Sequence, residues 1–222
     1  MDDFGGIASS GTYDFGGAAG STTLDLGGVF SLDLKRHFLT EAFYPSDLFD
    51  SRGLIDDITD FDGLTATEVN AEMLVRVTQD DPSGSPTYSG FQTFANGTYK
   101  GRGFQFRAKL TSNDVAQDIK VSQLGYTASL QRRTEQGNVT ASGAGAKAVT
   151  FTNPFFVGTS SLLGANTNLP SVGINAQNMA SGDYFEVSSI SGTGFTVHFK
   201  NSSNASIDRN FTYQAVGFGK GG

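Results

Sequence analysis

The clearest sign of how this chain folds is Gly103-Phe104-Gln105-Phe106-Arg107-Ala108-Lys109-Leu110. From Phe104 onward, apolar residues occupy every second position, and polar or charged residues stand between them. Successive side chains of a β-strand point to opposite faces, so this alternation predicts a strand with one buried and one solvated face. The chain holds 19 Phe and no Trp, which indicates a core made largely of Phe.

The same alternation recurs along the chain and gives an all-β prediction. In the first half it predicts further strands near residues 30–38, 69–77 and 124–130. In the second half we expect strands near residues 149–151, 172–176, 184–190, 195–199 and 211–218. Gly-rich turns separate them, as is typical of two stacked antiparallel sheets.

Two short segments qualify this pattern. Residues 34–43 also fit one face of a helix, but Pro45 and the missing N-cap before Leu34 favour the strand. Asn96-Gly97 is the strongest hairpin signal in the chain, because Asn and Gly accept the positive φ angles of a two-residue turn.

The N-terminus carries a repeat. Asp-Phe-Gly-Gly at residues 3–6 and 14–17 and Asp-Leu-Gly-Gly at residues 25–28 follow one another at a spacing of 11 residues. Paired glycines permit tight reversals, so short strands and a floppy arm ordered by a partner are both open interpretations. We predict a Gly-rich attachment arm over residues 1–28, with Phe4, Phe15 and Leu26 as its apolar contacts.

The remainder divides where the composition changes. A charged, turn-like segment at residues 132–137 precedes a run of small residues at 141–146. We therefore predict two β-sandwich modules, residues 29–134 and residues 135–222. The first is expected to be jelly-roll or galactose-binding-like, and the second lectin-like.

Composition narrows the function. There is no Cys, which excludes disulfides and thiolate chemistry, and only His37 and His198 are available as histidine ligands or bases. A net charge of −7 disfavours nucleic acid as a partner, because phosphate binding needs a positive field. Met1-Asp2-Asp3 begins the chain with acid where a secretory signal has positive charge, and no apolar run approaches a membrane span. We expect neither a signal peptide nor membrane insertion.

Several stretches resemble the distal modules of tail-tip and host-specificity proteins, including tail fibres and receptor-binding proteins, of tailed bacteriophages. In the first half these are residues 43–52, 60–63, 103–110 and 121–125. In the second half residues 170–184, 194–203 and 211–219 resemble the C-terminal β-sandwich of the same proteins. The matches together cover most of residues 30–219, whereas such modules usually end a much longer polypeptide.

The resemblance implies a virion component of the tail that adheres to the host surface, with other virion proteins and a surface glycan or protein as partners. It implies no active-site residues, because the family has no invariant catalytic signature. By analogy, such fibres act as homo-oligomers, and we expect a trimer, since multivalency turns weak contacts into firm attachment. A capsid or tail decoration protein without a receptor role is the alternative.

Aromatic residues are the first candidates for holding a sugar, because sugar rings stack on aromatic faces and Tyr adds a hydroxyl group. The ligand-binding candidates are Tyr88, Phe91, Tyr99, Phe155, Phe156 and Tyr184. Core packing is the competing interpretation for each, since Phe is usually buried. Phe155 and Phe156 point to opposite sides if the chain is extended, so both are buried only if both sides are covered, for example by a neighbouring subunit.

Metal binding and catalysis have weaker signals. Asp60-x-Asp62-Gly63 echoes part of a calcium loop, but Ile58 and Val69 stand where the full pattern needs carboxylates. A solvated acidic loop is the competing interpretation, and apart from this structural Ca²⁺ we expect no cofactor. No Gly-x-Ser-x-Gly is present to support a serine hydrolase. We therefore expect a non-enzymatic protein, with a glycan-degrading hydrolase as the remote alternative.

Overall fold

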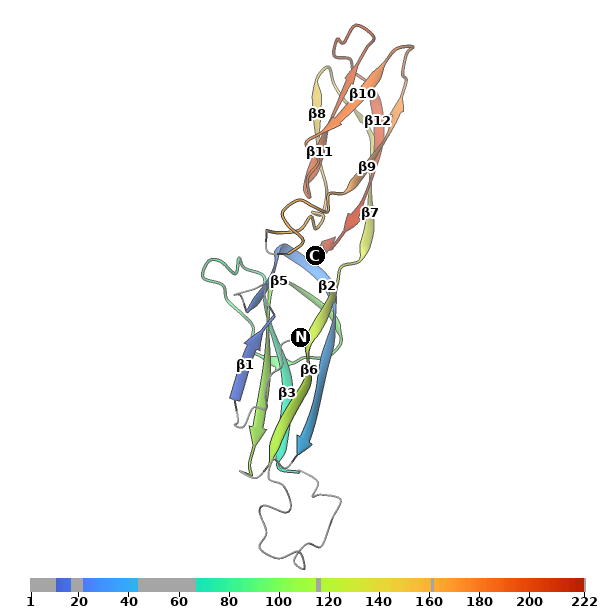
Figure 1. The fold of residues 1–222 in the computed structure, drawn as a ribbon. Helices are drawn as coiled ribbons and strands as arrows, with labels where there is room; N and C mark the ends of the chain where they lie inside the picture. The colour runs from blue at the N-terminus through green and yellow to red at the C-terminus, as the bar shows by residue number, and fades with distance from the viewer. Residues whose placement is uncertain (1–10, 17–21, 44–66, 115–116, 161, 222) are drawn as a thin grey trace, which may run out of the picture.

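The computed structural model describes residues 11–16, 22–43, 67–114, 117–160 and 162–221, and every regular element in them is a β-strand. The strands pair antiparallel in three sheets, which confirms the all-β prediction. Two modules lie end to end in an elongated molecule, with the C-terminus at their junction (Figure 1). None of the described residues forms a helix capable of crossing a membrane.

The first module is a single seven-stranded sheet that includes the last strand of the chain. Its strands are β1 (Gly11–Phe15), β2 (Thr23–Phe43), β3 (Val69–Thr78), β4 (Gln92–Thr93), β5 (Gly97–Ser112), β6 (Asp118–Ser129) and β13 (Lys220–Gly221). Residues 103–110 lie in β5, at the centre of the sheet. One side of β5 pairs with β3, and the other side pairs with β1 and β2.

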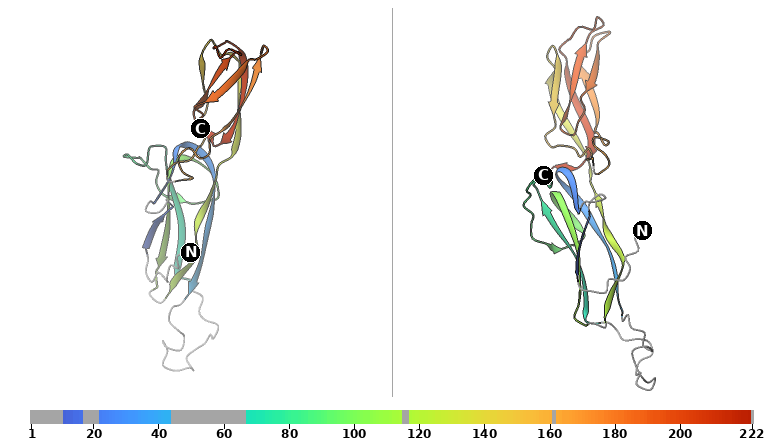
Figure 2. Two further views of the ribbon diagram at one scale, coloured as in Figure 1. Left: turned by 45° about the horizontal axis from the view of Figure 1, so that its top comes forward. Right: turned by 60° about the vertical axis from the view of Figure 1, so that its left-hand side comes forward.

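Strand β2 folds this sheet over itself. It is 21 residues long; its first half pairs with β5 and its second half with β6. The two layers enclose a core that includes Phe104, Phe106 and Leu34. The Tyr126 ring of β6 stacks on Phe106 of β5, with centroids 4.1 Å apart. The opposed layers are visible in the right-hand view of Figure 2.

Two local predictions are settled by this sheet. Residues 34–43 form a strand, as predicted, because β6 supplies their hydrogen-bonding partners. The predicted hairpin at Asn96-Gly97 is wrong, because the strands on its two sides do not pair with each other. β4, before the turn, pairs with β3, and Gly97, after it, pairs with Leu34 of β2. Asn96 instead accepts a hydrogen bond from the Arg36 N–H at 2.7 Å.

The N-terminal arm predicted for residues 1–28 does not hold over the described part of that range. Asp14-Phe15-Gly16 ends β1, and Asp25-Leu26-Gly27 lies in β2. In both copies the carboxylate binds an Arg of β5, the apolar side chain packs on the core, and a Gly follows with φ of 118° or 73°. The repeat therefore encodes two docked strand segments; Phe4 lies outside the described residues.

The second module is a sandwich of two three-stranded sheets. One sheet has the order β10-β11-β8 and the other β7-β12-β9. The strands are β7 (Arg132–Ala141), β8 (Ala146–Thr150), β9 (Ser171–Gln177), β10 (Tyr184–Ser188), β11 (Gly194–Lys200) and β12 (Asn210–Phe218). Between the sheets lies a core built mainly from Phe side chains: Phe151, Phe155, Phe195, Phe199 and Phe211.

The modules are interlocked at their junction. β7 begins at Arg132, so residues 132–134, assigned to the first module from sequence, belong to the second. β13 returns to pair with β2, so the C-terminus of the chain is part of the first sheet. Phe156 enters the first core and meets the Phe30 ring edge-on at 5.7 Å.

Arg133 ties the parts of this junction together. Its guanidinium donates to the carbonyl oxygens of Gly219 and Asn153, pairs with Glu135 at 3.0 Å and stacks on the Phe155 ring. Burial opposes ionisation of Glu135, but hydrogen bonds from the Thr152 N–H and Arg133 outweigh it, so the pKa of this carboxyl lies below its ordinary value.

Candidate functional site

Three of the six aromatic candidates lie in cores. Phe155 and Phe156 are each 2% exposed and fill the cores of the second and first modules, so neither offers a ring to a ligand. Both sides of the chain at Phe155 and Phe156 are covered, as expected for two buried rings. The cover comes from the two modules of this chain and not from a neighbouring subunit. Tyr99 packs edge-on against the buried Phe94, and its hydroxyl group binds the backbone of Ala95.

Tyr88 and Phe91 come together on the outer face of the first sheet, where the Arg76 guanidinium stacks against both rings. Tyr184 is 38% exposed on the outer face of the β10-β11-β8 sheet, but its hydroxyl group donates to Asn204 at 2.5 Å. All three therefore already have a partner within the chain.

The histidines do not form a catalytic triad among the described residues. His198 Nε2 is hydrogen-bonded to the Ser206 hydroxyl group at 2.8 Å, and His37 Nε2 to Thr127 at 2.7 Å. No carboxylate of the described chain forms an ion pair with either imidazole, so a third member to orient the ring is missing. Asp60 and Asp62 lie outside the described residues, and within the described ones no group of three or more potential metal ligands occurs.

A different surface stands out on the second module. The outer face of the β7-β12-β9 sheet presents the alternate residues whose neighbours point into the core. Across the three strands Gln136, Gln214 and Gly173 stand in one row, and Thr212 and Asn175 stand in the next. We call this surface the amide face: Thr134, Gln136, Ser171, Gly173, Asn175, Thr212, Gln214 and Val216.

The eight residues of the amide face carry no charge, and the next row on the same side of the sheet holds Arg132 opposite Phe218. The side-chain amides of Gln136, Asn175 and Gln214 are exposed, and none is hydrogen-bonded to another described residue. Each therefore turns both donors and acceptors toward solvent.

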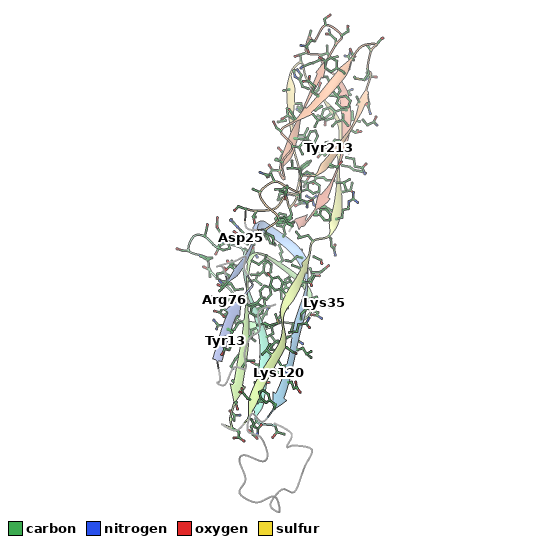
Figure 3. All side chains as sticks on the ribbon, viewed as in Figure 1. Tyr13, Asp25, Lys35, Arg76, Lys120 and Tyr213 are labelled. Carbon is green, nitrogen blue, oxygen red and sulfur yellow. The ribbon has the colours of Figure 1, made fainter. Side chains whose placement is uncertain are left out.

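Two glycines shape this face. A Cβ placed on Gly173 meets only the Gln214 carbonyl oxygen, at 3.9 Å, so the missing side chain leaves open space above the sheet. Gly137 is covered from the core side by the Tyr213 ring, whose position in the upper module is labelled in Figure 3. The result is a shallow hollow of about 450 Å³ between the amides, within the range of about 300–1,000 Å³ typical of ligand sites.

The chemistry of the hollow suits hydroxyl groups. A hydroxyl group both donates and accepts, and a side-chain amide offers one acceptor and two donors side by side, so each amide can satisfy two neighbouring hydroxyl groups. No charged group lies among these amides to favour an ion over a neutral ligand. The amide face therefore offers hydrogen-bonding groups of the kind that hydroxyl groups need.

Sequence reasoning missed this face because it looked for aromatic rings. A signal was present on β9 and β12, where polar uncharged residues alternate with apolar ones. On β12, for example, Thr212 and Gln214 alternate with the buried Phe211 and Ala215. What the sequence did not show is that β7, β9 and β12 are neighbours, which gathers those residues on one surface.

Comparisons with known proteins add little to this picture. No protein-family model and no curated protein matches the chain. A solved structure, recombinant discoidin II of Dictyostelium discoideum, is similar over 83% of this chain and 74% of that chain, with 14% identity and a TM-score of 0.28. The fold described above rests on the strand pairing of the chain itself.

Proposed function

We propose that this chain is a non-enzymatic adhesion protein that binds a neutral surface glycan through the amide face. The observation that carries the proposal is the row of unpaired amides around the open floor at Gly173. Three neighbouring strands of a sandwich fix the backbone beneath these groups, so the ordering cost of binding is confined to the amide side chains, at about 0.5–1.5 kcal/mol each. Each hydrogen bond adds a modest net amount, which suits reversible attachment.

The setting of this activity follows the resemblance in the sequence. We propose a component of a bacteriophage tail, acting as a homo-oligomer, with a trimer as the simplest arrangement. Several weak sugar sites on one particle give a strong combined attachment if the geometry lets them engage together. A decoration protein of the tail or capsid without a receptor role is the other candidate within the same setting.

A substitution that fills the hollow tests the site. Gly173→Val places a β-branched side chain, which strands favour, in the open space above the sheet. We expect it to abolish binding to any neutral glycan that the wild type binds on a glycan array, while the unfolding temperature stays unchanged. The matched control is Gly125→Val on β6, where a Cβ meets nothing within 4 Å.

The same array separates the alternatives. No binding to any glycan by an oligomeric wild-type protein favours the decoration role, and binding that survives Gly173→Val contradicts the amide face as the site. Release of reducing sugar from a bound polysaccharide would instead support a glycan-degrading hydrolase, whose chemistry needs a pair of carboxylates.

A further inference from the structure

A stack of guanidinium and aromatic groups lies on the outer face of the first sheet. Arg76 projects from β3, and its Cζ lies 4.7 Å from the ring centroid of Tyr88 and 4.6 Å from that of Phe91. The Phe91 ring also receives Arg107 of β5, whose Cζ is 4.1 Å from its centroid. Tyr88 and Phe91 belong to the segment between β3 and β4, which folds back over the sheet.

The nitrogens of the two arginines are used differently. Arg107 donates from Nε and Nη2 to the two carboxylate oxygens of Asp14, at 2.6 and 2.9 Å. Arg76 donates from Nε to the side-chain oxygen of Gln105, at 2.7 Å. Within the described chain the two Nη nitrogens of Arg76 have no hydrogen-bond partner, and no carboxylate forms an ion pair with it.

Nearby charges leave Arg76 uncompensated. The pKa of Asp14 is lowered chiefly by its hydrogen bond from Arg107, and the charge of Arg76 adds a smaller effect. Both carboxylate oxygens of Asp14 are already hydrogen-bonded to Arg107. The next arginine, Arg102, is paired with both Asp25 and Asp81, at 3.1 and 2.8 Å. Arg76 therefore keeps an edge of its guanidinium without a carboxylate, in a chain of net charge −7.

The segment that carries the two rings is fixed to β3 by hydrogen bonds that do not involve the Arg76 side chain. Ser89 binds Val77 of β3 twice, through its N–H at 2.9 Å and its hydroxyl group at 3.0 Å. Thr78 donates to the Thr87 carbonyl oxygen at 2.8 Å, which closes the loop further along. Stacking on the two rings fixes the plane of the Arg76 guanidinium, and its two Nη nitrogens are not fully buried.

We propose that Arg76, held between Tyr88 and Phe91, binds one anionic group of a surface glycan through its two Nη nitrogens. The fork of a guanidinium matches the paired oxygens of a carboxylate or a phosphate, and both are carried by sugars. The flanking rings provide apolar contact for the sugar ring next to that group. The site lies in the other module from the amide face, as the positions of Arg76 and Tyr213 in Figure 3 show, and it goes beyond the neutral-glycan function proposed above.

Calorimetric titration with three defined probes tests the site. The probes are a glucuronate tetrasaccharide, glycerol phosphate and a neutral glucose tetrasaccharide. We expect the wild type to bind one or both anions and Arg76→Gln to bind them at least about tenfold more weakly, the loss expected for hydrogen bonds to a charged group. Binding of the uronate only, or of the phosphate only, identifies the source of the anionic group.

Two further variants make the test specific. Arg76→Lys keeps the charge without the fork and should recover only part of the affinity. Lys109→Gln removes a cation from β5 of the same sheet, paired with Glu72 at 4.0 Å, and should change affinity less than about twofold, as expected for a surface pair.

The proposal is overturned if Lys109→Gln weakens binding as much as Arg76→Gln, because the attraction is then a general field. It is equally overturned if the wild type binds neither anion at millimolar concentration. Amide hydrogen exchange at Val77 and Ser89 must stay unchanged in Arg76→Gln, which shows that the loop is retained. Because Gly173→Val should leave anion binding intact, failure of this site and failure of the amide face are distinguishable.

Discussion

Phe155 and Phe156 are adjacent in the chain, and each completes the core of a different module. Phe155 packs edge-on against Phe151 inside the second sandwich, at 5.0 Å, while Phe156 meets Phe30 inside the first. The second module encloses its core with its own two sheets. The first module, in contrast, takes a core residue from the second and a strand from the end of the chain.

This difference indicates a hierarchy of stability. The core of the second module depends on residues between 149 and 215, all within that module. The first module needs Phe156 and β13 in place, so its folding is coupled to that of its neighbour. Strand β2 is therefore stabilised from the far end of the chain, through β13 and Phe156.

Replacing each of these two Phe residues tests the hierarchy most strongly. Phe156→Ala should destabilise the first module by about 3–5 kcal/mol, as expected for a buried Phe, although the residue lies among elements of the second. Phe155→Ala should cost a similar amount in the second module. Hydrogen exchange at β2 and β11 separates the effects; if Phe156→Ala exposes β11 and spares β2, the proposed coupling is wrong.

The next largest loss of stability is expected from a glycine substitution in the second module. A Cβ on Gly137 collides with the Tyr213 ring, so Gly137→Ala should destabilise this module by about 2–3 kcal/mol through overpacking. Gly173→Ala, on the other edge of the same sheet, should be tolerated, because its Cβ meets only the Gln214 oxygen. Thermal unfolding measures both; equal destabilisation would contradict the described placement of Tyr213.

Acid should weaken the junction through Glu135. Its pKa is lower in the folded chain than the ordinary 4.5, so its stabilising contribution is present above that value and is lost as pH falls through the folded pKa. Glu135→Gln should cost about 1.5 kcal/mol at pH 7, in the range for bonds to a charged group, and should flatten the loss of stability below about pH 4.5. Chemical denaturation from pH 7 to pH 3 checks this; parallel curves for both proteins would exclude Glu135 as the source.

The smallest effect is expected at the repeat in the first module. Asp14→Asn removes the charge that Arg107 binds, but both side chains are partly exposed, so the loss should stay below about 1 kcal/mol. Because the pKa of Asp14 is lowered mainly by Arg107, this small contribution should also vanish as pH falls below the ordinary value of 3.8. A double-mutant cycle with Arg107→Gln measures it, and a coupling of zero would show that the repeat docks through Phe15 alone.

Much of the fold was predictable, and little of the candidate site was. Alternation in β5 and β11 identified the strands and their buried faces, because the period of two is a property of each strand alone. The arm prediction failed because the 11-residue repeat shows where turns occur without showing that Arg102 and Arg107 lie beside the two Asp residues. Tyr88 and Phe91 were found as candidates, but not their shared partner Arg76.

Composition and local periodicity are enough to predict that the chain is all-β, that Phe fills its cores and that Cys chemistry is excluded. The tertiary structure alone decided which strands are neighbours. That choice gathers Gln136, Gln214 and Asn175 on one surface and sends Phe155 and Phe156 into two different cores. The physical reason is that strand pairing depends on contacts between residues far apart in the chain, which no local pattern of side chains specifies.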